Sequence, residues 1–233
     1  MLRRLVLTAL FIPTIAFAKT VQVGGQGSVQ AEPDLVFVNV SLSHRDMNAK
    51  KAQEQVAKAH AGLVEALQSF GLSKDSYPTV NFAITPIYRY GGSLSKTGKP
   101  QFEGFEVSHQ VEVEFKETAK IGRLLDKVAG LSSEAQLRID GLNWQVKQHK
   151  QFELKALNLA VADCKTKAEV IADAAGSKLG PVDTLRHGFS HSPIPMSHRG
   201  AMEMAVAGSA APTNINPKAL EISAHVDCVY SLN

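Results

Sequence analysis

The chain contains only two cysteines, Cys164 and Cys228, in 233 residues. It therefore lacks the several disulfides that stabilise many small secreted proteins. Aromatic residues are also scarce, at 6 %, and Trp144 is the single tryptophan. No C-x-x-C pair, H-E-x-x-H zinc motif or G-x-S-x-G nucleophile elbow occurs. These absences remove the sequence case for a C-x-x-C redox site, a zinc protease and a serine hydrolase.

Only one long apolar run is present, and it stands at the N-terminus. Residues 1–18, MLRRLVLTALFIPTIAFA, contain a basic pair, an apolar run and a small-x-small AFA ending. This order predicts a secretory signal peptide that is cut after Ala18. The run is shorter than the about 20 residues of a membrane span, and no cysteine at the cut would accept a lipid. We therefore expect an exported chain, in the periplasm of a Gram-negative host, with no transmembrane segment in its mature part.

The charge of the expected mature chain is close to neutral. Cleavage removes two of the 25 basic residues and none of the 22 acidic ones, which leaves a net charge of +1. Proteins that bind nucleic acid hold its phosphates with a basic patch or stripe, and no such stripe occurs here. We therefore predict no nucleic-acid partner. The acidic residues are scattered along polar faces, so no carboxylate pair stands out for catalysis.

The two cysteines lie on predicted core faces. Cys164 recurs at helical spacing with apolar neighbours, and Cys228 shares one face of an alternating strand with Ile222 and Val226. Two readings stay open: a disulfide formed in an oxidising compartment, or two buried thiols that pack as small hydrophobes. The sequence does not supply the Cα separation that a bridge requires. No neighbouring feature lowers the pKa of either thiol, so a thiol peroxidase is not predicted.

Glycines are concentrated after the predicted cleavage site, in VQVGGQGSVQAEPD. Gly25-Gln26-Gly27 begins like a dinucleotide fingerprint, but the third glycine is absent and a strand follows where a helix is required. The stretch SKTGKP (95–100) likewise lacks the spacing of a P-loop. Glycine inside a strand more often marks a bulge or the close approach of another backbone. We interpret Gly24, Gly25 and Gly27 in this way and predict no nucleotide cofactor.

Hydrophobic periodicity predicts the helices and strands of the chain. Strands are expected over residues 21–29, 35–43, 77–90, 105–115, 137–146, 182–187 and 219–230. Helices are expected over residues 47–70, 118–130 and 152–179, with Gly71 and Gly180-Pro181 ending the first and the last. Residues 91–100 and 188–216 are expected to be loops.

An internal repeat underlies this order of elements. FEVSHQVEVEF (105–115) aligns without gaps with LEISAHVDCVY (220–230), and a strand, a long helix, a strand and a polar loop precede both. The alternative is chance agreement between two amphipathic strands, against which the shared order argues. We predict an α+β fold of duplicated β-α-β-β units, with antiparallel-rich sheets covered by two long helices and a short linking helix. The halves would span residues 19–116 and 131–233.

The loop after residue 187 is rich in imidazole and thioether groups. It reads HGFSHSPIPMSHRGAMEM (187–204), and three of the five methionines fall within nine residues. Copper prefers such ligands, so the loop is a candidate copper site formed by His191, Met196, His198, Met202 and Met204. The alternative is a Pro- and Ser-rich loop whose methionines pack against a neighbour, because the spacing fixes no coordination geometry. The isolated His60, His109 and His225 are interpreted as satisfied core or surface groups.

Several stretches together resemble the SIMPL-domain family. VGGQGSVQAEPDLVFVNVSLS (23–43) is similar to the opening of its members, and GFEVSHQVEVEFKETAKIGRLLDKVAG (104–130) to their central strand and short helix. KALNLAVADCKTKAEVIADAAGSKLG (155–180) resembles their Ala-rich helix, and PKALEISAHVDCVYSL (217–232) their closing strand. The resemblance covers nearly all of the expected mature chain. Pro217-Lys218 stands where the family commonly has Pro-Gly, and the His/Met loop is not a family feature.

The resemblance implies an α+β fold, an exported location and a part in oxidative-stress tolerance. It also implies self-association, since at least one relative assembles into a large channel-like ring. No catalytic residues are established for the family, so neither an enzyme activity nor a cofactor is implied. We therefore expect a non-enzymatic periplasmic protein that forms a homo-oligomer and protects the envelope under stress. A copper-handling protein that uses residues 187–204 is the alternative.

Overall fold

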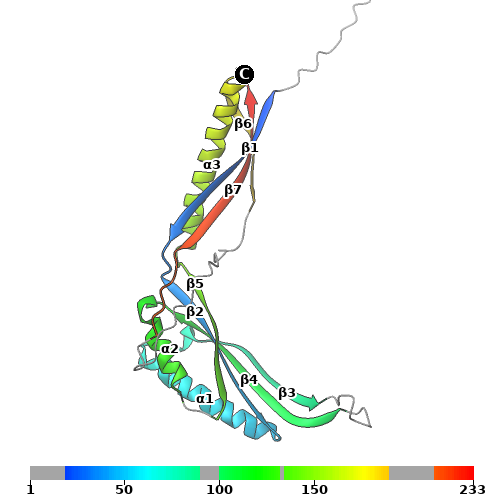
Figure 1. Cartoon of the computed structure of the whole chain (residues 1–233), viewed down its shortest axis with the longest axis vertical. Helices are drawn as coiled ribbons and strands as arrows, with labels where there is room; N and C mark the ends of the chain where they lie inside the picture. The colour runs from blue at the N-terminus through cyan, green and yellow to red at the C-terminus, as the bar shows by residue number, and fades with distance from the viewer. Residues whose placement is uncertain (1–18, 90–99, 132–133, 189–212) are drawn as a thin grey trace, which may run out of the picture. The chain divides into compact units, whose positions relative to one another are not determined.

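The computed structural model describes residues 19–89, 100–131, 134–188 and 213–233, which form two compact units (Figure 1). Among these residues the first unit contains 19–29, 152–188 and 222–233, and the second contains those from 30 to 151 and from 213 to 221. The predicted signal peptide (1–18) and most of the two expected loops lie outside the described residues. Each unit combines a sheet with helices, and the pairing of neighbouring strands is antiparallel wherever it is defined, so the predicted α+β class is confirmed.

The second unit is a four-stranded sheet with helices on one face. Its strand order is β3 (Thr79–Arg89), β4 (Gln101–Phe115), β2 (Leu35–Asp46) and β5 (Gln136–Gln145). The helices are α1 (Ala49–Ser69) and α2 (Ile121–Ala129), and short 3₁₀ turns η1 (Lys74–Ser76) and η2 (Thr118–Lys120) precede β3 and α2. Alternate residues of β2 face the helices and are buried, as the period of two predicts: Val36, Val38, Val40 and Leu42.

Helix α1 begins and ends where the local sequence stabilises its ends. The side chain of Asn48 accepts hydrogen bonds from the N–H groups of Lys50 and Lys51, at 2.9 and 3.4 Å. At the other end Gly71 adopts a φ of +78° and donates its N–H to the carbonyl of Gln68 at 2.8 Å. The predicted apolar stripe is confirmed, because its members in the helix are buried: Ala52, Val56, Ala59, Leu63 and Leu67.

The first unit is a three-stranded sheet with one helix on its face. The strand order is β1 (Thr20–Ala31), β7 (Leu220–Leu232) and β6 (Leu179–Gly188), and the helix is α3 (His149–Ala174). The helix buries small residues at every fourth position: Ala156, Ala160, Cys164, Ala168 and Ala172. Opposite them, alternate residues of β7 are buried: Ile222, Ala224, Val226, Cys228 and Tyr230. Small side chains on the helix let it lie close to the strands.

Gly25 and Gly27 bring the backbone of β1 directly against α3. A Cβ atom on Gly25 would lie 2.1 Å from the carbonyl oxygen of Ala160, and one on Gly27 would lie 2.2 Å from that of Ala156. Real Cβ atoms do not approach other atoms this closely. A Cβ atom on Gly24 would project from the other face of the strand and lie 3.1 Å from the His225 ring. The predicted close approach of another backbone is thus confirmed at Gly25 and Gly27.

Helix α3 ends earlier than expected. Gly176 adopts a φ of +67°, and the N–H of Ser177 donates to the carbonyl of Ala172 at 2.9 Å, which closes the helix soon after Ala174. The expected stop at Gly180-Pro181 is wrong, because these residues lie in β6. β6 is an edge strand of its sheet, and such a strand accommodates a proline, whose missing N–H can point away from the ladder.

The compact units do not follow the two halves expected at residues 19–116 and 131–233. β1, from the expected first half, lies in the sheet with β7 and β6, while β5, from the second, pairs with β2. Alternation specifies which face of a strand is buried but not which strand becomes its neighbour. The two repeated segments nevertheless lie in interior strands, β4 and β7, of their respective sheets. The duplication itself stays a prediction from the sequence.

Candidate functional site

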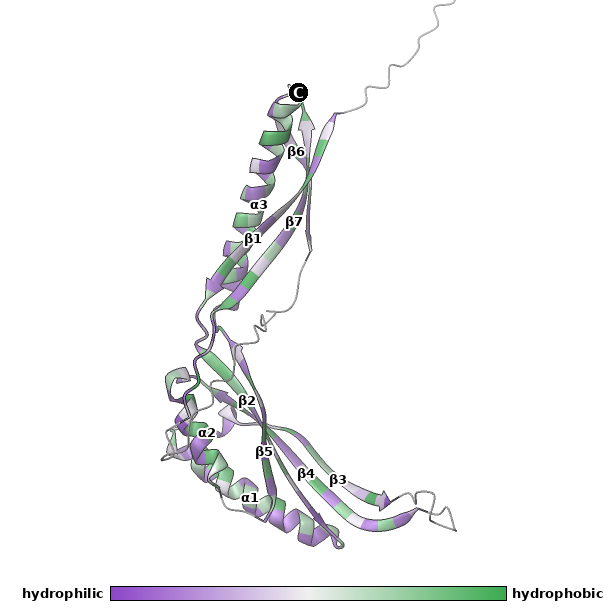
Figure 2. Ribbon diagram, in the orientation of Figure 1, coloured by the Kyte–Doolittle hydropathy of each residue, from purple (hydrophilic) through white to green (hydrophobic). Residues whose placement is uncertain are grey.

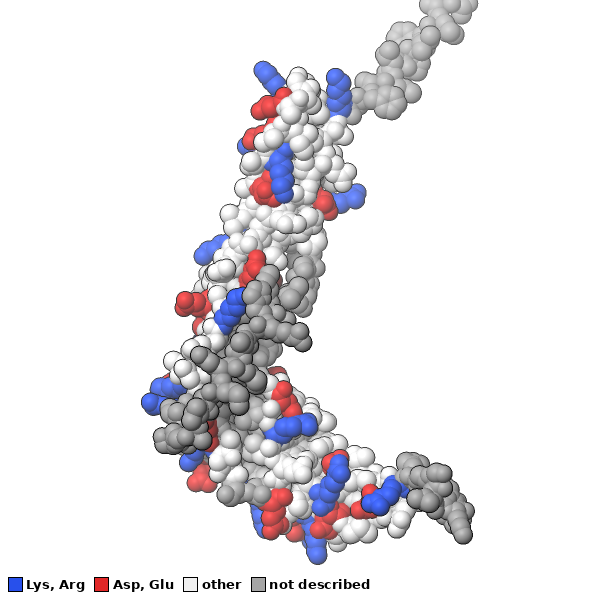
Figure 3. Space-filling model, in the orientation of Figure 1, with Lys and Arg blue, Asp and Glu red and all other residues white. Residues whose placement is uncertain are grey.

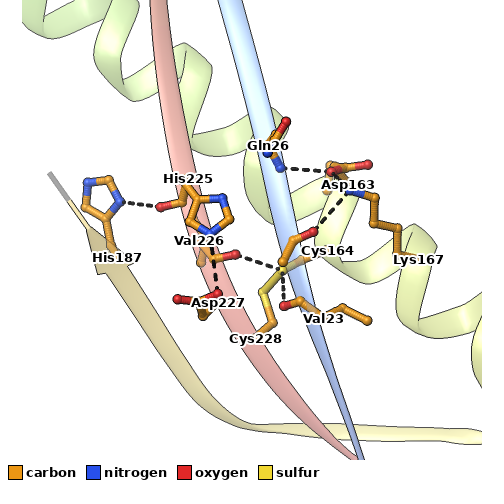
Figure 4. Close-up of a disulfide and its surroundings, with 12 residues drawn as sticks. Val23, Gln26, Asp163, Cys164, Lys167, His187, His225, Val226, Asp227 and Cys228 are labelled. Carbon is orange, nitrogen blue, oxygen red and sulfur yellow. Dashed lines mark hydrogen bonds and ion pairs between the residues drawn. A yellow bond between two sulfur atoms is a disulfide. The ribbon is translucent and has the colours of Figure 1, made fainter. Parts of the chain in front are cut away.

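Cys164 of α3 and Cys228 of β7 form a disulfide in the core of the first unit (Figure 4). Their Cα atoms are 6.3 Å apart, within the range that a bridge requires. Both residues are fully buried, at 0 % exposure. External thiols therefore have no access to the sulfur atoms while the unit is folded. The bridge acts as a structural crosslink between helix and sheet rather than as a redox centre.

A group of polar contacts beside the disulfide fixes β1 against α3 (Figure 4). The carboxylate Oδ2 of Asp163 accepts hydrogen bonds from Lys167 Nζ at 2.7 Å and from the N–H of Gln26 at 2.8 Å. Lys167 Nζ also donates to the carbonyl of Gly24 at 3.1 Å. The bond from Lys167, and then that from Gln26, hold the pKa of Asp163 below its ordinary value. Asp163 is therefore an ionised acceptor that positions a strand, not a general acid.

The five residues of the candidate copper site lie outside the described residues: His191, Met196, His198, Met202 and Met204. His187, where the loop sequence begins, is on β6, and its Nδ1 lies 3.2 Å from the carbonyl oxygen of His225. Within the four described ranges, no group of three or more His, Cys, Asp or Glu residues is placed to hold a metal ion. Copper binding stays a prediction from the sequence.

Replacing Met196 and His198 with alanine tests the copper prediction. Titration of the unchanged protein with Cu(I) and Cu(II) should produce heat at micromolar metal, and the double variant should lose it because a thioether and an imidazole are removed. A thermal melt of the variant controls for folding. No heat from the unchanged protein would end the copper hypothesis.

His60 and His109 form a stacked pair between α1 and the sheet. The two residues lie far apart in the sequence, so no local pattern predicts the pair. Their ring centroids are 4.3 Å apart, and Nε2 of His109 lies 2.7 Å from Oγ1 of Thr79. Burial lowers the pKa of both rings, and the charge of His60 lowers that of His109 further. The sequence held one signal of this position, since His109 lies on the same alternating face of β4 as the buried Val111.

The free energy of unfolding should fall in acid because of this pair. An unfolded histidine has an ordinary pKa of 6.5, whereas the folded pair takes up protons only at lower pH. Below about pH 6.5 the unfolded state therefore binds more protons, so the stabilisation is present above that pH and is lost as the pH falls through the lowered values. Urea unfolding between about pH 5 and pH 8 measures the effect.

The double variant His60→Gln/His109→Gln is the control for this pH dependence. It removes both titrating rings and keeps hydrogen-bonding side chains, so the slope of stability against pH between about pH 5 and pH 6.5 should become shallower. An unchanged slope in the double variant would show that other groups cause the acid sensitivity.

A row of apolar side chains is exposed on β3, which is an edge strand of the second sheet. Phe82 and Ile84 lie on one face of the strand and are 47 and 44 % exposed, and Val80, at a register shift just before them, is 54 % exposed. Tyr88 follows them and packs edge-on against Phe102 of β4, with 5.6 Å between ring centroids. We call these five residues the β3 surface. Grouped exposed apolar side chains of this kind mark interaction sites in proteins.

The β3 surface lies next to the part of the sheet that α1 covers. Phe82 packs edge-on against His109, with 5.5 Å between ring centroids, and His109 in turn stacks on His60 of α1. Beyond this point the β3–β4 hairpin runs on past α1 in the view of Figure 1, and hydrophobic positions continue along β3 (Figure 2). The apolar face of the strand therefore continues without a helix to cover it.

Charged side chains show no comparable grouping. On the face drawn in Figure 3, basic and acidic side chains are interspersed. Several form exposed pairs, such as Arg45 with Glu106 at 2.9 Å and Lys116 with Glu114 at 3.1 Å. Such pairs contribute only about 0–1 kcal/mol each to stability. The β3 surface, rather than a charged patch, is therefore the best-defined candidate site.

Comparison with known proteins identifies relatives along almost the whole chain. Residues 21–230 match the SIMPL family, described as a protein of unknown function (DUF541). The 26 kDa periplasmic immunogenic protein of Brucella melitensis is 29 % identical over 200 residues, which cover 84 % of this chain and 77 % of that protein. The uncharacterized protein YggE of Escherichia coli is 26 % identical over 211 residues, covering 89 % of this chain and 81 % of the relative. YggE of Edwardsiella ictaluri is 24 % identical over 210 residues.

The names of these relatives describe a location or an uncharacterized protein, and none names an enzyme. None of the helices in the described part of the chain combines the length and the apolarity that crossing a membrane requires. The motifs that resembled one family in the sequence lie almost entirely within the matched residues, which cover the helices and strands of the described part of the chain except for one residue of β1 and two of β7. The chain therefore belongs to the SIMPL family.

Proposed function

We propose that the protein is an exported, non-enzymatic protein of the periplasm that assembles with copies of itself. The β3 surface is the observation that carries the assembly. The predicted signal peptide supports export, and the name of the Brucella relative supports the periplasm as the destination. The assembled form protects the envelope under oxidative stress, as the family resemblance implies.

The sequence of β3 supports pairing between copies. The strand reads TVNFAITPIYR, and its first charged residue is Arg89 at its end. Natural edge strands avoid pairing with other chains by means of charges, prolines or bulges. Between the register shifts at Thr79/Asn81 and Ile87/Tyr88, β3 pairs regularly with β4, and before Pro86 it has no charge to prevent pairing with another chain. Two copies that align their β3 edges around a two-fold axis would continue the sheet and bury both apolar rows against each other.

The double variant Phe82→Lys/Ile84→Lys should disrupt the assembly. It places two charges in the proposed contact, where each would lose its hydration without gaining a partner. Sedimentation velocity should show a shift from the assembled particle to smaller species. Both positions are about half exposed, at 47 and 44 %, so the fold should persist, which circular dichroism checks.

The matched control is Asn81→Lys/Thr85→Lys, which adds the same charge to exposed positions on the other face of the same strand. This variant should sediment largely as the unchanged protein does. If both variants assemble like the unchanged protein, the β3 surface is not the interface and this part of the proposal is wrong.

Protection against oxidants would not use a thiol of this chain. Both cysteines are in the buried disulfide, so no thiolate is available to reduce a peroxide. We therefore assign protection to the assembled particle. A bacterial strain that lacks its own SIMPL protein should survive peroxide better when it exports the unchanged chain than when it exports Phe82→Lys/Ile84→Lys. Equal survival would remove the protective part of the proposal and leave the assembly to be judged by sedimentation.

A further inference from the structure

A cavity of about 910 Å³ lies in the second unit and shares no residue with the β3 surface. Three parts of the chain line it: the turn at Glu32 and Pro33, the start of the η2–α2 region, and the segment 213–219. Its volume falls in the range of about 300–1,000 Å³ that is typical of small-molecule sites.

One wall of the cavity is held in place by specific contacts. A Cβ atom on Gly122 of α2 would lie 1.8 Å from the carbonyl oxygen of Thr213, so this glycine lets the segment lie on the helix. The carboxylate of Asp126 accepts hydrogen bonds from the N–H of Thr213, at 3.1 Å, and from its hydroxyl. Ile215 packs against the core of the unit. The cavity is therefore formed before any ligand enters.

Among the described residues that line the cavity, one is a cation and one is an anion, and they come from different elements. Arg123 extends from α2 and Glu32 from the turn after β1, and both are exposed. Neither makes an ion pair with any residue in the described part of the chain, so the two are also unpaired with each other. Asn214 and Asn216, which carry side-chain amides, also line the cavity, and prolines and alanines add apolar lining.

We propose that this cavity binds a short peptide with free ends, with the peptide carboxylate at Arg123 and the peptide ammonium at Glu32. A guanidinium binds a carboxylate through two parallel hydrogen bonds, which adds orientation to charge. The side-chain amides of Asn214 and Asn216 can both donate to and accept from a peptide backbone. The prolines and alanines leave room for small apolar side chains. A free amino acid has the same charged groups, and the experiment separates the two.

Calorimetric titration of the purified protein with alanine, dialanine and trialanine tests the proposal. At least one peptide should bind more tightly than alanine, because only a longer ligand reaches both charged walls. N-acetyl-trialanine and trialanine amide each lack one charge and should bind about tenfold more weakly than trialanine, the loss that one charge-assisted hydrogen bond gives. Absence of heat with every peptide, or equal affinity for free and blocked peptides, would overturn the proposal. If alanine binds more tightly than either peptide, the ligand is a free amino acid and the peptide proposal is wrong.

Two variants locate the binding. Arg123→Gln should weaken trialanine about tenfold and make trialanine and its amide bind equally, because the group that distinguishes them is gone. Glu32→Gln should do the same for trialanine and its N-acetyl form. Arg186→Gln removes an exposed arginine of the first unit and should leave the affinity unchanged. Unaltered trialanine binding by Arg123→Gln, with a normal thermal melt, would place the binding elsewhere and overturn the assignment.

Discussion

Replacing Gly25 or Gly27 with alanine should lower the free energy of unfolding of the first unit by about 3 kcal/mol or more. A single added carbon would lie 2.1 or 2.2 Å from a carbonyl oxygen of α3, and that oxygen belongs to backbone rather than to a side chain that can rotate away. The strand and the helix would therefore have to separate. Because a domain has a total stability of about 5–15 kcal/mol, this change would remove a large part of it.

Helix α3 has little freedom to move away from the added carbon. The Cys164–Cys228 bridge ties it to β7, and the hydrogen bonds of Asp163 tie it to β1 at the N–H of Gln26. Relief of the clash would break these contacts or leave gaps among the small side chains beneath the helix. Either outcome loses packing in the core of the unit.

Gly24→Ala is the matched control for these variants. It adds the same carbon to the same strand, but on the face where the nearest group is the His225 ring, at 3.1 Å, and the next is the Asp227 carboxylate, at 3.9 Å. The ring is exposed at a side-chain fraction of 48 % and can shift, so the cost should stay below about 1 kcal/mol. Hydrogen exchange of amides in α3 follows the first unit, while Trp144 fluorescence follows the second. Equal exchange in Gly24→Ala and Gly25→Ala would contradict the close approach.

Removing the disulfide should cost about 4 kcal/mol of unfolding free energy. Cys164 and Cys228 are separated by 64 residues, and the chain-entropy estimate for a loop of that length gives this value. The double variant Cys164→Ala/Cys228→Ala removes the crosslink while keeping small apolar side chains in the buried positions. Urea unfolding, followed by hydrogen exchange of α3 and β7, measures the loss.

The oxidation state of the protein provides the control for this prediction. In the folded protein the buried bridge should resist a mild reductant, and after denaturation the same reductant should release two thiols. Without reductant, the denatured protein should contain none. Two free thiols in the unreduced denatured protein would exclude the bridge, and equal stability of the unchanged protein and the double variant would show that it adds nothing.

Local patterns in the sequence predict where helices and strands lie better than they predict which elements pair or pack together. The stripe of α1 from Ala52 to Leu67 and the alternation of β2 depend on residues near one another, and both are confirmed. The end of α3 was misplaced, because Gly176 and Gly180 both look like helix stops and only the backbone shows which adopts a positive φ. β1 and β5 each lie in the sheet that the expected halves assigned to the other. Their placement depends on pairing with strands distant in the sequence, which alternation does not encode.

For the candidate sites too, local features could be predicted from the sequence and long-range contacts could not. Gly25 and Gly27 could be interpreted from the sequence as a close-approach signal, although the partner helix could not be named. The stacking of His60 on His109 and the grouping of Glu32 with Arg123 at a cavity bring together residues far apart in the chain. No spacing pattern in the sequence predicts that these residues come together. The exposed row of β3 alternates like any half-buried strand, so only the structure shows that its apolar face lacks a cover.

The mass of the native particle in solution tests the proposed assembly most directly. Light scattering on the purified protein, with Phe82→Lys/Ile84→Lys beside it, requires no knowledge of a ligand. A single chain has a mass of at most 25.1 kDa. The unchanged protein should show a mass that is a multiple of one chain, and the variant should move toward the mass of one chain. A monomer at every concentration examined would contradict the assembly through the β3 surface.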